Sequence, residues 1–154
     1  MFHGSAECII DGKGRVSIPA KYLEIMGERR QLIFTRFFFE SDHHPQPYHC
    51  LDIYPLHEWQ RFVREFRGQP RFDPNISAFE NFYIAESHGV NVDTHGRILL
   101  PPPLRDYAGL RKLVKFTAAL EKFRVWDKAS WERYSQEAEA RLRKNPEIFN
   151  SLRL

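Results

Sequence analysis

The chain has 154 residues, which suits one compact domain or two very small units that share a core. Hydrophobic residues make up 42% of the sequence and aromatic residues 14%, so a disordered chain is excluded. The net charge of +3 permits a polyanionic partner without requiring one. The two cysteines have no zinc-ligand spacing, and the sequence shows neither a signal-peptide pattern nor a long apolar run. These features predict a soluble cytoplasmic protein with no membrane span.

Two copies of one short pattern divide the sequence. The first, Asp-Gly-Lys-Gly-Arg-Val-Ser-Ile-Pro, occupies residues 11–19, and the second, Asp-Thr-His-Gly-Arg-Ile-Leu-Leu-Pro, occupies residues 93–101. The two copies align without a gap from Asp11 and Asp93 to Thr35 and Thr117. The alignment resumes with Ile53 on Val125, after extra residues around 40–49 in the first copy. Agreement of this length predicts that one structural unit is repeated in the chain.

The same order of elements is predicted in both copies. In chain order these are strands at 6–10 and 15–18, a helix at 20–26 and a hairpin of 31–39 with 50–54, and then strands at 89–92 and 97–100, a helix at 103–108 and a hairpin of 112–117 with 123–126. Gly14 and Gly96 supply the positive φ that a tight turn between the first two strands needs. Pro19 and Pro101 each end a strand and start a helix, because proline has no amide to donate to a sheet.

The segments around the two copies are predicted to be loops and helices. Residues 40–49 are polar and rich in proline, which suits an elongated hairpin loop rather than core. A helix is expected to begin after each hairpin, at Leu56 and at Lys128. A linker at 68–73 precedes a further helix at 74–84, where apolar residues recur on one face.

These elements predict a mainly β fold with short helices, of the α+β class. The division is a first repeat at 5–57, a helical linker at 58–85, a second repeat at 86–129, and a C-terminal helix and tail at 130–154. The C-terminal helix is rich in charge, which is typical of a solvated surface, with docking on a neighbouring subunit as the alternative.

The sequence resembles the MraZ family over nearly its whole length. The residues that carry the resemblance are Asp11–Lys21, Asp93–Pro101, Leu104–Leu110, Val125–Asp127 and Trp131. MraZ proteins are similar to the SpoVT and AbrB regulators, so the resemblance implies tandem AbrB-like repeats that form one swapped-hairpin β-barrel. It also implies a nucleoid-associated transcriptional regulator that assembles into a closed homo-oligomeric ring and binds double-stranded DNA at promoter repeats.

The resemblance further implies that such a regulator represses its own division and cell-wall gene cluster. Two features depart from the family pattern. One is the insertion at 40–49, and the other is Arg124, where the family more often has an acidic residue. Both departures are expected to affect contacts with partners more than they affect the barrel.

Arg15 and Arg97 are the leading candidates for contact with DNA. An arginine directly after a tight turn is anchored at its backbone, while its guanidinium can bridge two phosphate oxygens or bind guanine O6 and N7. Lys13 and His95 occupy the turn tips, where Lys13 offers a point charge for phosphate and His95 offers one only when protonated. We therefore expect the first turn to contribute more affinity than the second at neutral pH.

Four further residues are predicted to support the turns, namely Asp11, Gly14, Asp93 and Gly96. Because a carboxylate repels phosphate, the two aspartates are expected to accept hydrogen bonds from turn amides or to orient the neighbouring arginine. A single Asp-x-x-Gly-Arg pattern would favour a purely structural Asp–Arg pair. Two copies in matching register favour the DNA interface instead.

The sequence predicts neither a metal site nor a catalytic site. His43, His44, His49 and Cys50 lie close together in the sequence, but their spacing matches no zinc pattern, so no metal site is predicted. No nucleophile with a base, no carboxylate pair and no phosphate-binding loop is recognisable, because Asp-Gly-Lys-Gly lacks the Walker spacing. We therefore predict neither enzyme activity nor a cofactor.

The aromatic residues leave a second class of function open. Phe37–Phe39, Trp59 and Trp131 could stack on bases, but their positions in strands and helices favour the core or a subunit interface. Together with the insertion at 40–49, they allow an alternative in which the protein is an interaction ring for a protein partner and its turns are only structural. Deleting the loop would distinguish the two, since only the alternative predicts lost partner binding with intact DNA binding.

Overall fold

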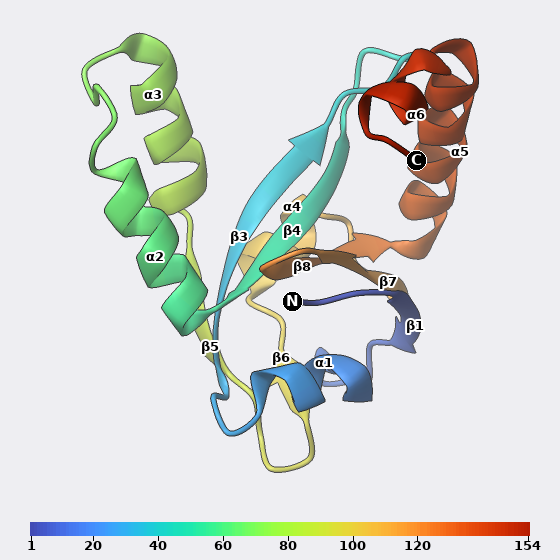
Figure 1. Cartoon of the computed structure of the whole chain (residues 1–154). Coiled ribbons are helices and arrows are strands. Elements are labelled where there is room, and N and C mark those ends of the chain that lie inside the picture. Colours follow the sequence, from blue (N-terminus) through green and yellow to red (C-terminus); the bar gives the residue numbers. More distant parts are fainter.

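Eight strands in two sheets form the β part of the computed structural model, which describes all residues 1–154 (Figure 1). The strands are β1 (Ser5–Ile9), β2 (Arg15–Ser17), β3 (Gln31–Phe39), β4 (Tyr48–Pro55), β5 (His88–Asn91), β6 (Arg97–Leu99), β7 (Leu113–Ala119) and β8 (Lys122–Asp127). Six of them form an antiparallel sheet in the order β1-β7-β8-β4-β3-β5, and β2 pairs with β6. The predicted combination of strands and short helices is confirmed.

Strand pairing crosses between the two copies of the repeated pattern. β1 pairs with β7 and β5 pairs with β3, so each first strand joins the hairpin of the other copy. The registers are equivalent, because Ala6 lies opposite Phe116, and their counterparts in the other copy, His88 and Phe34, also lie opposite each other. In the small sheet, Val16 of β2 lies opposite its equivalent in β6. The pairing pattern therefore has an internal two-fold symmetry.

The large sheet does not close into the predicted barrel. β1 and β5 remain its two edges, and β2 and β6 pair only with each other, over three residues each. A barrel needs a continuous ladder in which every strand is bonded on both sides, and strands this short cannot bridge the two edges. A single closed barrel was therefore the wrong expectation for this subunit. An open six-stranded sheet packs with a separate two-stranded one.

One hydrophobic core of 20 buried residues joins the two sheets. Val16 of the small sheet and Phe34 of the large sheet are both part of it. Two short helices, α1 (Ala20–Met26) and α4 (Pro102–Tyr107), follow β2 and β6 and bury one face each in the same core. Both helices start directly after a proline, as predicted, so the chain turns from strand to helix at equivalent places in the two copies.

Helices α2 (Leu56–Phe66) and α3 (Pro74–Phe79) form a hairpin at the left of Figure 1. The Asp73 carboxylate accepts hydrogen bonds from two amides of the first turn of α3, and Pro74 follows it, which fixes the start of this helix. α3 continues into a π-helical turn, η1 (Glu80–Ile84). The single helix predicted here therefore changes its hydrogen-bond period at residue 80.

Aromatic side chains attach this helical hairpin to the sheet. Trp59 of α2 and Tyr83 of η1 pack with Tyr54 of β4 in a cluster separate from the main core. The hydroxyl of Thr35 in β3 donates to the Tyr83 carbonyl at 2.5 Å. The expectation that Trp59 packs in the interior is confirmed, and its partners lie between helix and sheet.

Two helices, α5 (Lys128–Lys144) and α6 (Glu147–Ser151), end the chain at the right of Figure 1. The loop of the insertion is shorter than predicted, because β4 already begins at Tyr48, which is buried opposite Phe39. The rest of the loop packs on α5 through hydrogen bonds to Glu137. No helix in the structure combines the length and the apolar character needed to cross a membrane.

Candidate nucleic-acid interface

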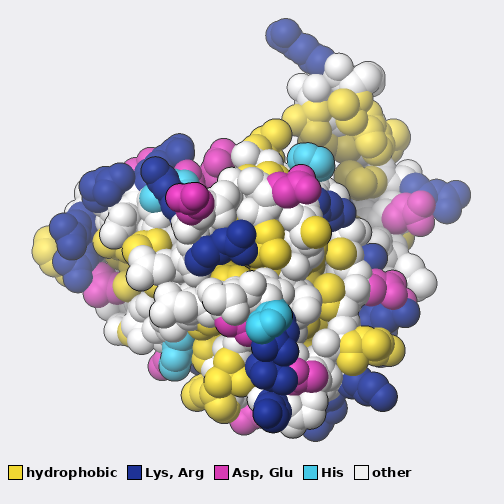
Figure 2. All heavy atoms as spheres, turned by 90° about the horizontal axis from the view of Figure 1, so that it is seen from below, with side chains coloured by type: hydrophobic (Ala, Val, Ile, Leu, Met, Phe, Trp, Pro, Cys, Tyr) yellow, Lys and Arg dark blue, Asp and Glu magenta, His cyan; other side chains and the backbone are white.

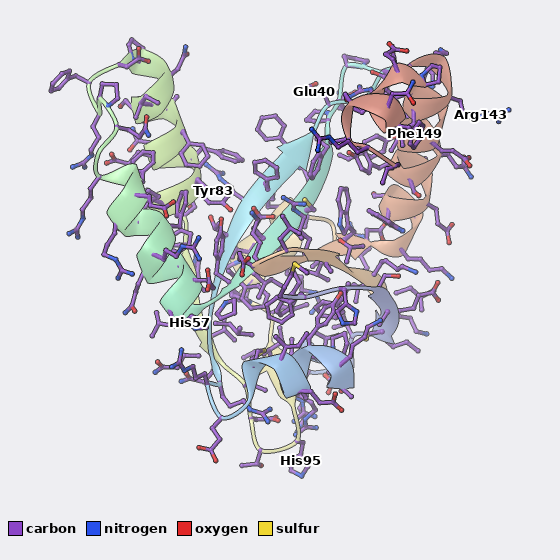
Figure 3. All side chains as sticks on the ribbon, in the orientation of Figure 1. Glu40, His57, Tyr83, His95, Arg143 and Phe149 are labelled. Carbon is purple, nitrogen blue, oxygen red and sulfur yellow. The ribbon has the colours of Figure 1, made fainter.

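Two tight turns, at residues 11–15 and 93–97, lie at the end of the molecule that carries α1 and β6, and His95 marks the tip of the second (Figures 1 and 3). Each turn contains a glycine with positive φ, which is +84° at Gly14 and +79° at Gly96. Residues other than glycine rarely adopt a positive φ. The repeated glycine of the pattern is therefore required by the backbone.

In the first turn, one carboxylate holds both the backbone and the arginine. Oδ1 of Asp11 accepts hydrogen bonds from the amides of Lys13 and Arg15, both at 2.9 Å. Oδ2 of Asp11 accepts a third hydrogen bond, from Nε of Arg15 at 2.8 Å. The Asp11 side chain therefore fixes the turn and the direction of the guanidinium at once.

The second turn repeats this arrangement. Oδ1 of Asp93 accepts hydrogen bonds from the amides of His95 at 2.8 Å and of Arg97 at 2.9 Å, and Oδ2 accepts one from Nε of Arg97 at 3.1 Å. Both arginine side chains are 31% exposed. In both turns only Nε is used internally, so the two terminal Nη groups of each arginine remain available as donors.

The two carboxylates are charged at neutral pH. The amide of Arg15 is the main cause that lowers the pKa of Asp11 to about 2, with further contributions from its guanidinium and from the Lys13 amide. The pKa of Asp93 is also lowered, first of all by the amide of Arg97. Charged acceptors strengthen these hydrogen bonds, so the arginines are held in place before any ligand binds.

Both arginines lie on the outer face of the small sheet. Arg15 is opposite Leu99 and Ser17 is opposite Arg97, while the central pair of β2 and β6 points into the core. Because side chains alternate along a strand, these four residues share one face. Arg15 and Arg97 are diagonal neighbours on it, a relation that usually separates residues by roughly 7–8 Å. One face of the small sheet therefore carries both arginines.

The surroundings of the two turns differ in charge. A cavity of about 520 Å³ beside Lys13 and Gly14 is lined by Arg105 and Arg111. In the alignment of the two copies, Arg105 corresponds to Leu23, so the second turn has no such arginine behind it. Seen from this end of the molecule, basic side chains form several groups with acidic ones among them (Figure 2). Arg105 and Arg111 have no local sequence signal, because only the packing of α4 and of the segment after it brings them to the turn.

Arg124, which was expected to affect contacts with partners, instead forms an ion pair inside the subunit. Its Nε lies 2.6 Å from Oδ1 of Asp52, a carboxylate that is only 1% exposed. The hydroxyl of Tyr83 donates a hydrogen bond to the other oxygen of Asp52. Asp52 and Arg124 are opposite each other where β4 pairs with β8, so this departure from the family pattern is accommodated within the sheet.

The histidines of the insertion do not converge on one point. The ring of His44 packs against Tyr48, and the ring of His49 stacks on Tyr107 with centroids 4.2 Å apart. Cys50 is fully buried in a small cluster with Tyr48. Across the structure, no group of three or more His, Cys, Asp or Glu side chains is arranged to hold a metal ion.

Known proteins are similar to this chain over nearly its whole length. Residues 1–40 and 83–148 match the family model described as "MraZ protein, putative antitoxin-like". A protein of Acetivibrio thermocellus named "Transcriptional regulator MraZ" is 39% identical over 135 residues, which are 88% of this chain and 87% of that protein.

Two further relatives carry the same name. The protein of Desulfitobacterium hafniense (strain DSM 10664 / DCB-2) is 37% identical over 90% of both chains. The protein of Shewanella oneidensis is 34% identical over 155 aligned residues, which cover 100% of this chain and 97% of that protein. On the family model and on these full-length similarities, the chain belongs to the MraZ family of transcriptional regulators.

Proposed function

We propose that this protein is a sequence-specific transcriptional regulator that binds double-stranded DNA with the outer face of its small sheet. The observation that carries the proposal is the pair of equivalent turns, in which Asp11 and Asp93 each hold one arginine by Nε alone. The free Nη groups of Arg15 and Arg97 are suited to bidentate contact with guanine or with phosphate. Ionised aspartate keeps both groups oriented without occupying them.

The tips of the turns are proposed to add phosphate contacts. Lys13 is exposed and positively charged, whereas His95 adds charge only when protonated. The first turn also has Arg105 and Arg111 beside it. The proposal therefore assigns the larger share of electrostatic affinity to the first turn.

Assembly into a closed homo-oligomeric ring is part of the proposal. A single subunit offers few basic groups, and several subunits on repeated promoter boxes would make later contacts intramolecular, which can raise affinity by roughly 10²–10⁴. The cross-copy pairing of strands supports a swapped-hairpin arrangement within each subunit. The proposed role is repression of the protein's own division and cell-wall gene cluster, in the cytoplasm and on the nucleoid.

Fluorescence anisotropy with DNA from upstream of the protein's own gene tests this site at two salt concentrations. Removing Arg15 or Arg97 as Arg→Ala should cost roughly 1–3 kcal/mol of binding free energy if each contacts a base. The double variant Lys13→Ala with Arg15→Ala should bind more weakly than His95→Ala with Arg97→Ala, because the first turn carries more positive charge.

Unfolding curves of the same variants serve as the control for folding. Unchanged DNA binding by both single arginine variants would overturn the assigned interface. Equal losses from the two double variants would show that the two turns contribute alike, which contradicts the predicted difference between them.

A further inference from the structure

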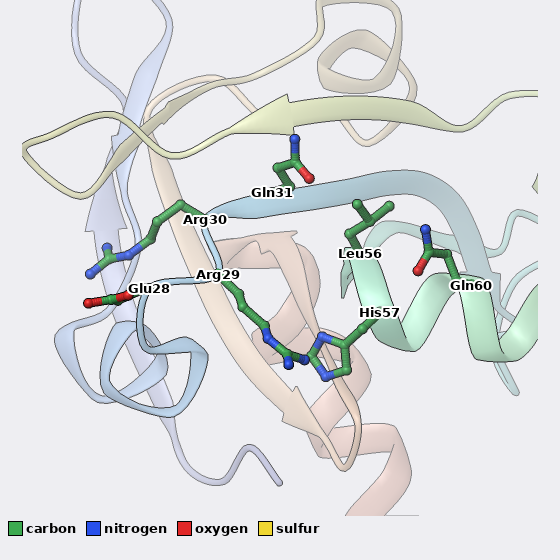
Figure 4. Close-up of a pocket in the computed structure, with 7 residues that line it drawn as sticks. All are labelled: Glu28, Arg29, Arg30, Gln31, Leu56, His57 and Gln60. Atoms are coloured by element: carbon green, nitrogen blue, oxygen red, sulfur yellow. The ribbon is translucent and has the colours of Figure 1, made fainter.

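A second basic site lies in a cleft of about 420 Å³ between the start of β3 and the start of α2 (Figure 4). Arg29 and Arg30 line it on one side, and His57 and Gln60 of α2 line it on the other. Arg29 points toward His57 in Figure 4 and takes part in no side-chain hydrogen bond or ion pair. Glu28 is the one acidic residue in the lining.

The donors in this cleft are largely unused. Arg30 donates Nε to the carbonyl of Gly27, and its side chain points away from α2 in Figure 4, which leaves Arg29 as the guanidinium that faces the helix. The residue before α2 is Pro55, and no side chain caps this helix. The amides of the first turn of a helix have no partner within the helix, so α2 adds backbone donors to the Arg29 guanidinium. His57 lies 3.4 Å from Glu58, which is outside the lining.

The other copy contains the equivalent cleft, but with two carboxylates in its lining. It is lined by Arg111 and Lys112 together with Asp127, Lys128 and Glu132 of the α5 side. The carboxylate of Asp127 caps α5 by accepting from the amide of Ser130 at 3.1 Å. In the alignment of the two copies, Asp127 corresponds to Pro55 and Glu132 to Gln60. The first cleft therefore lacks the two carboxylates that line the second.

We infer that the cleft between Arg29 and the start of α2 at His57 is a binding site for a phosphate group. The Arg29 guanidinium, the uncapped amides of α2 and the amide nitrogen of Gln60 offer donors from which phosphate oxygens can accept. In the equivalent cleft, the Asp127 carboxylate accepts a hydrogen bond from the first turn of α5, so a negatively charged group already occupies that helix end. A space of this size accepts one phosphate group with its ester substituent.

The position of the cleft connects it to the proposed DNA interface. The amide of Val92 donates to the carbonyl of Arg30 at 2.9 Å, so the cleft begins beside the residue that leads into the second turn. A phosphate of the DNA backbone that passes the second turn is one source of the ligand, and this source rests on the function proposed above. A small phosphorylated molecule is the other source.

Two measurements on the full-length protein test the site. In the first, inorganic phosphate is titrated at constant ionic strength against chloride, and the melting temperature is followed. We expect phosphate to raise the melting temperature of the wild type, because a ligand of the native state stabilises it. The rise should be lost in Arg29→Gln and kept in Lys112→Gln, a variant of the other cleft that lies outside the cavity beside the first turn.

The second measurement is the salt dependence of binding to promoter DNA. If the site receives a backbone phosphate, Arg29→Gln should reduce the slope of log affinity against log salt by about 0.9 and weaken binding several-fold at low salt. If it receives a small ligand, the slope should stay unchanged while the phosphate-induced rise disappears. Either pattern supports the site.

The inference is overturned if Arg29→Gln changes neither the response to phosphate nor the salt slope, or if Lys112→Gln loses as much as Arg29→Gln. His57→Ala checks the helix side of the cleft and should give the same direction of change as Arg29→Gln. A wild-type protein that binds no DNA would contradict the proposed function, while the titration with phosphate would still decide about this cleft.

Discussion

At the scale of single residues, the turns combine two roles in one side chain. Asp11 and Asp93 each satisfy two turn amides with one oxygen and hold an arginine with the other. A purely structural pair would engage the guanidinium more fully, for example through two parallel hydrogen bonds. Here Nε alone is engaged, and the end of the side chain remains exposed.

The ionisation of Asp11 should make stability depend on pH. Its pKa in the folded protein is about 2, below the unfolded value of about 3.9, so the carboxylate stabilises the fold above about pH 4. This contribution is lost as the pH falls through the folded pKa. Thermal unfolding of Asp11→Asn should therefore show a lower melting temperature than wild type at pH 7, with the gap closing between pH 4 and pH 2.

Asp106→Asn is the matched control for this experiment, because Asp106 is an exposed aspartate of α4 without an ion pair. It should leave the melting temperature nearly unchanged across the same range. A gap between wild type and Asp11→Asn that stays constant down to pH 2 would mean that the carboxylate charge does not act as described.

The sequence allowed part of the candidate site to be predicted. The residues of the two turns follow from a local pattern, so Arg15, Arg97 and their aspartates could be found without a structure. Arg105 could not, since it reaches the first turn only through the packing of α4 from the other copy. The ion pair of Asp52 with Arg124 was missed for the same reason, because it forms across paired strands.

At the scale of elements, the insertion between β3 and β4 is held by one side chain of α5. Glu137 accepts hydrogen bonds from the Ser41 hydroxyl at 2.9 Å, from the Asp42 amide at 2.7 Å and from the Tyr48 hydroxyl. Arg141, one turn further along α5, forms an ion pair with Asp42 at 2.5 Å. The loop is therefore attached to the C-terminal helix at two successive turns.

Glu137→Ala should release the tip of this hairpin. Without the carboxylate the amide of Asp42 loses its acceptor, so its hydrogen exchange should become faster by an order of magnitude or more. Glu139→Ala, an exposed residue of the same helix, should leave the exchange unchanged. Equal exchange in all three proteins would show that the loop is held by other contacts.

Most elements were predictable from local signals, and the differences have physical causes. Strand β4 starts before Cys50 because the aromatic ring of Tyr48 is buried, although the segment before it has the composition of a loop. The π-helical turn η1 has a period that a 3.6-residue pattern does not describe. The open sheet follows from the short length of β2 and β6, which a pattern of alternating residues does not determine.

At the scale of the whole molecule, the two copies meet where β4 pairs with β8. Asp52 and Arg124 are equivalent positions of the two copies, and they face each other there as an acid and a base. Two identical charges at these positions would repel each other across the strands. Because these equivalent positions carry opposite charges, they form an ion pair that connects the two copies.

Breaking this pair should destabilise the protein strongly. Asp52→Ala leaves the guanidinium of Arg124 largely buried without its partner, which typically costs about 3–5 kcal/mol of the free energy of unfolding. Urea denaturation measures this difference. The exchanged variant, Asp52→Arg with Arg124→Asp, should recover only part of it, because Tyr83 donates a hydrogen bond at the Asp52 side alone.

Glu7→Ala provides the comparison for this measurement. Glu7 forms ion pairs with Lys115 and Lys128 at the surface, and losing such pairs usually costs less than about 1 kcal/mol. A cost for Asp52→Ala as small as that for Glu7→Ala would mean that the central pair contributes little to stability.

The exchange of strands between the copies also sets the order in which the chain can fold. β1 is made first, but its partner β7 lies near the other end of the chain, and β2 likewise needs β6. During synthesis, the first half can form its own hairpin of β3 and β4 while β1 and β2 have no partner. Contacts between such distant segments slow folding. The proposed DNA-facing surface therefore forms late, because β2 stays without its partner until the chain through β6 has been made.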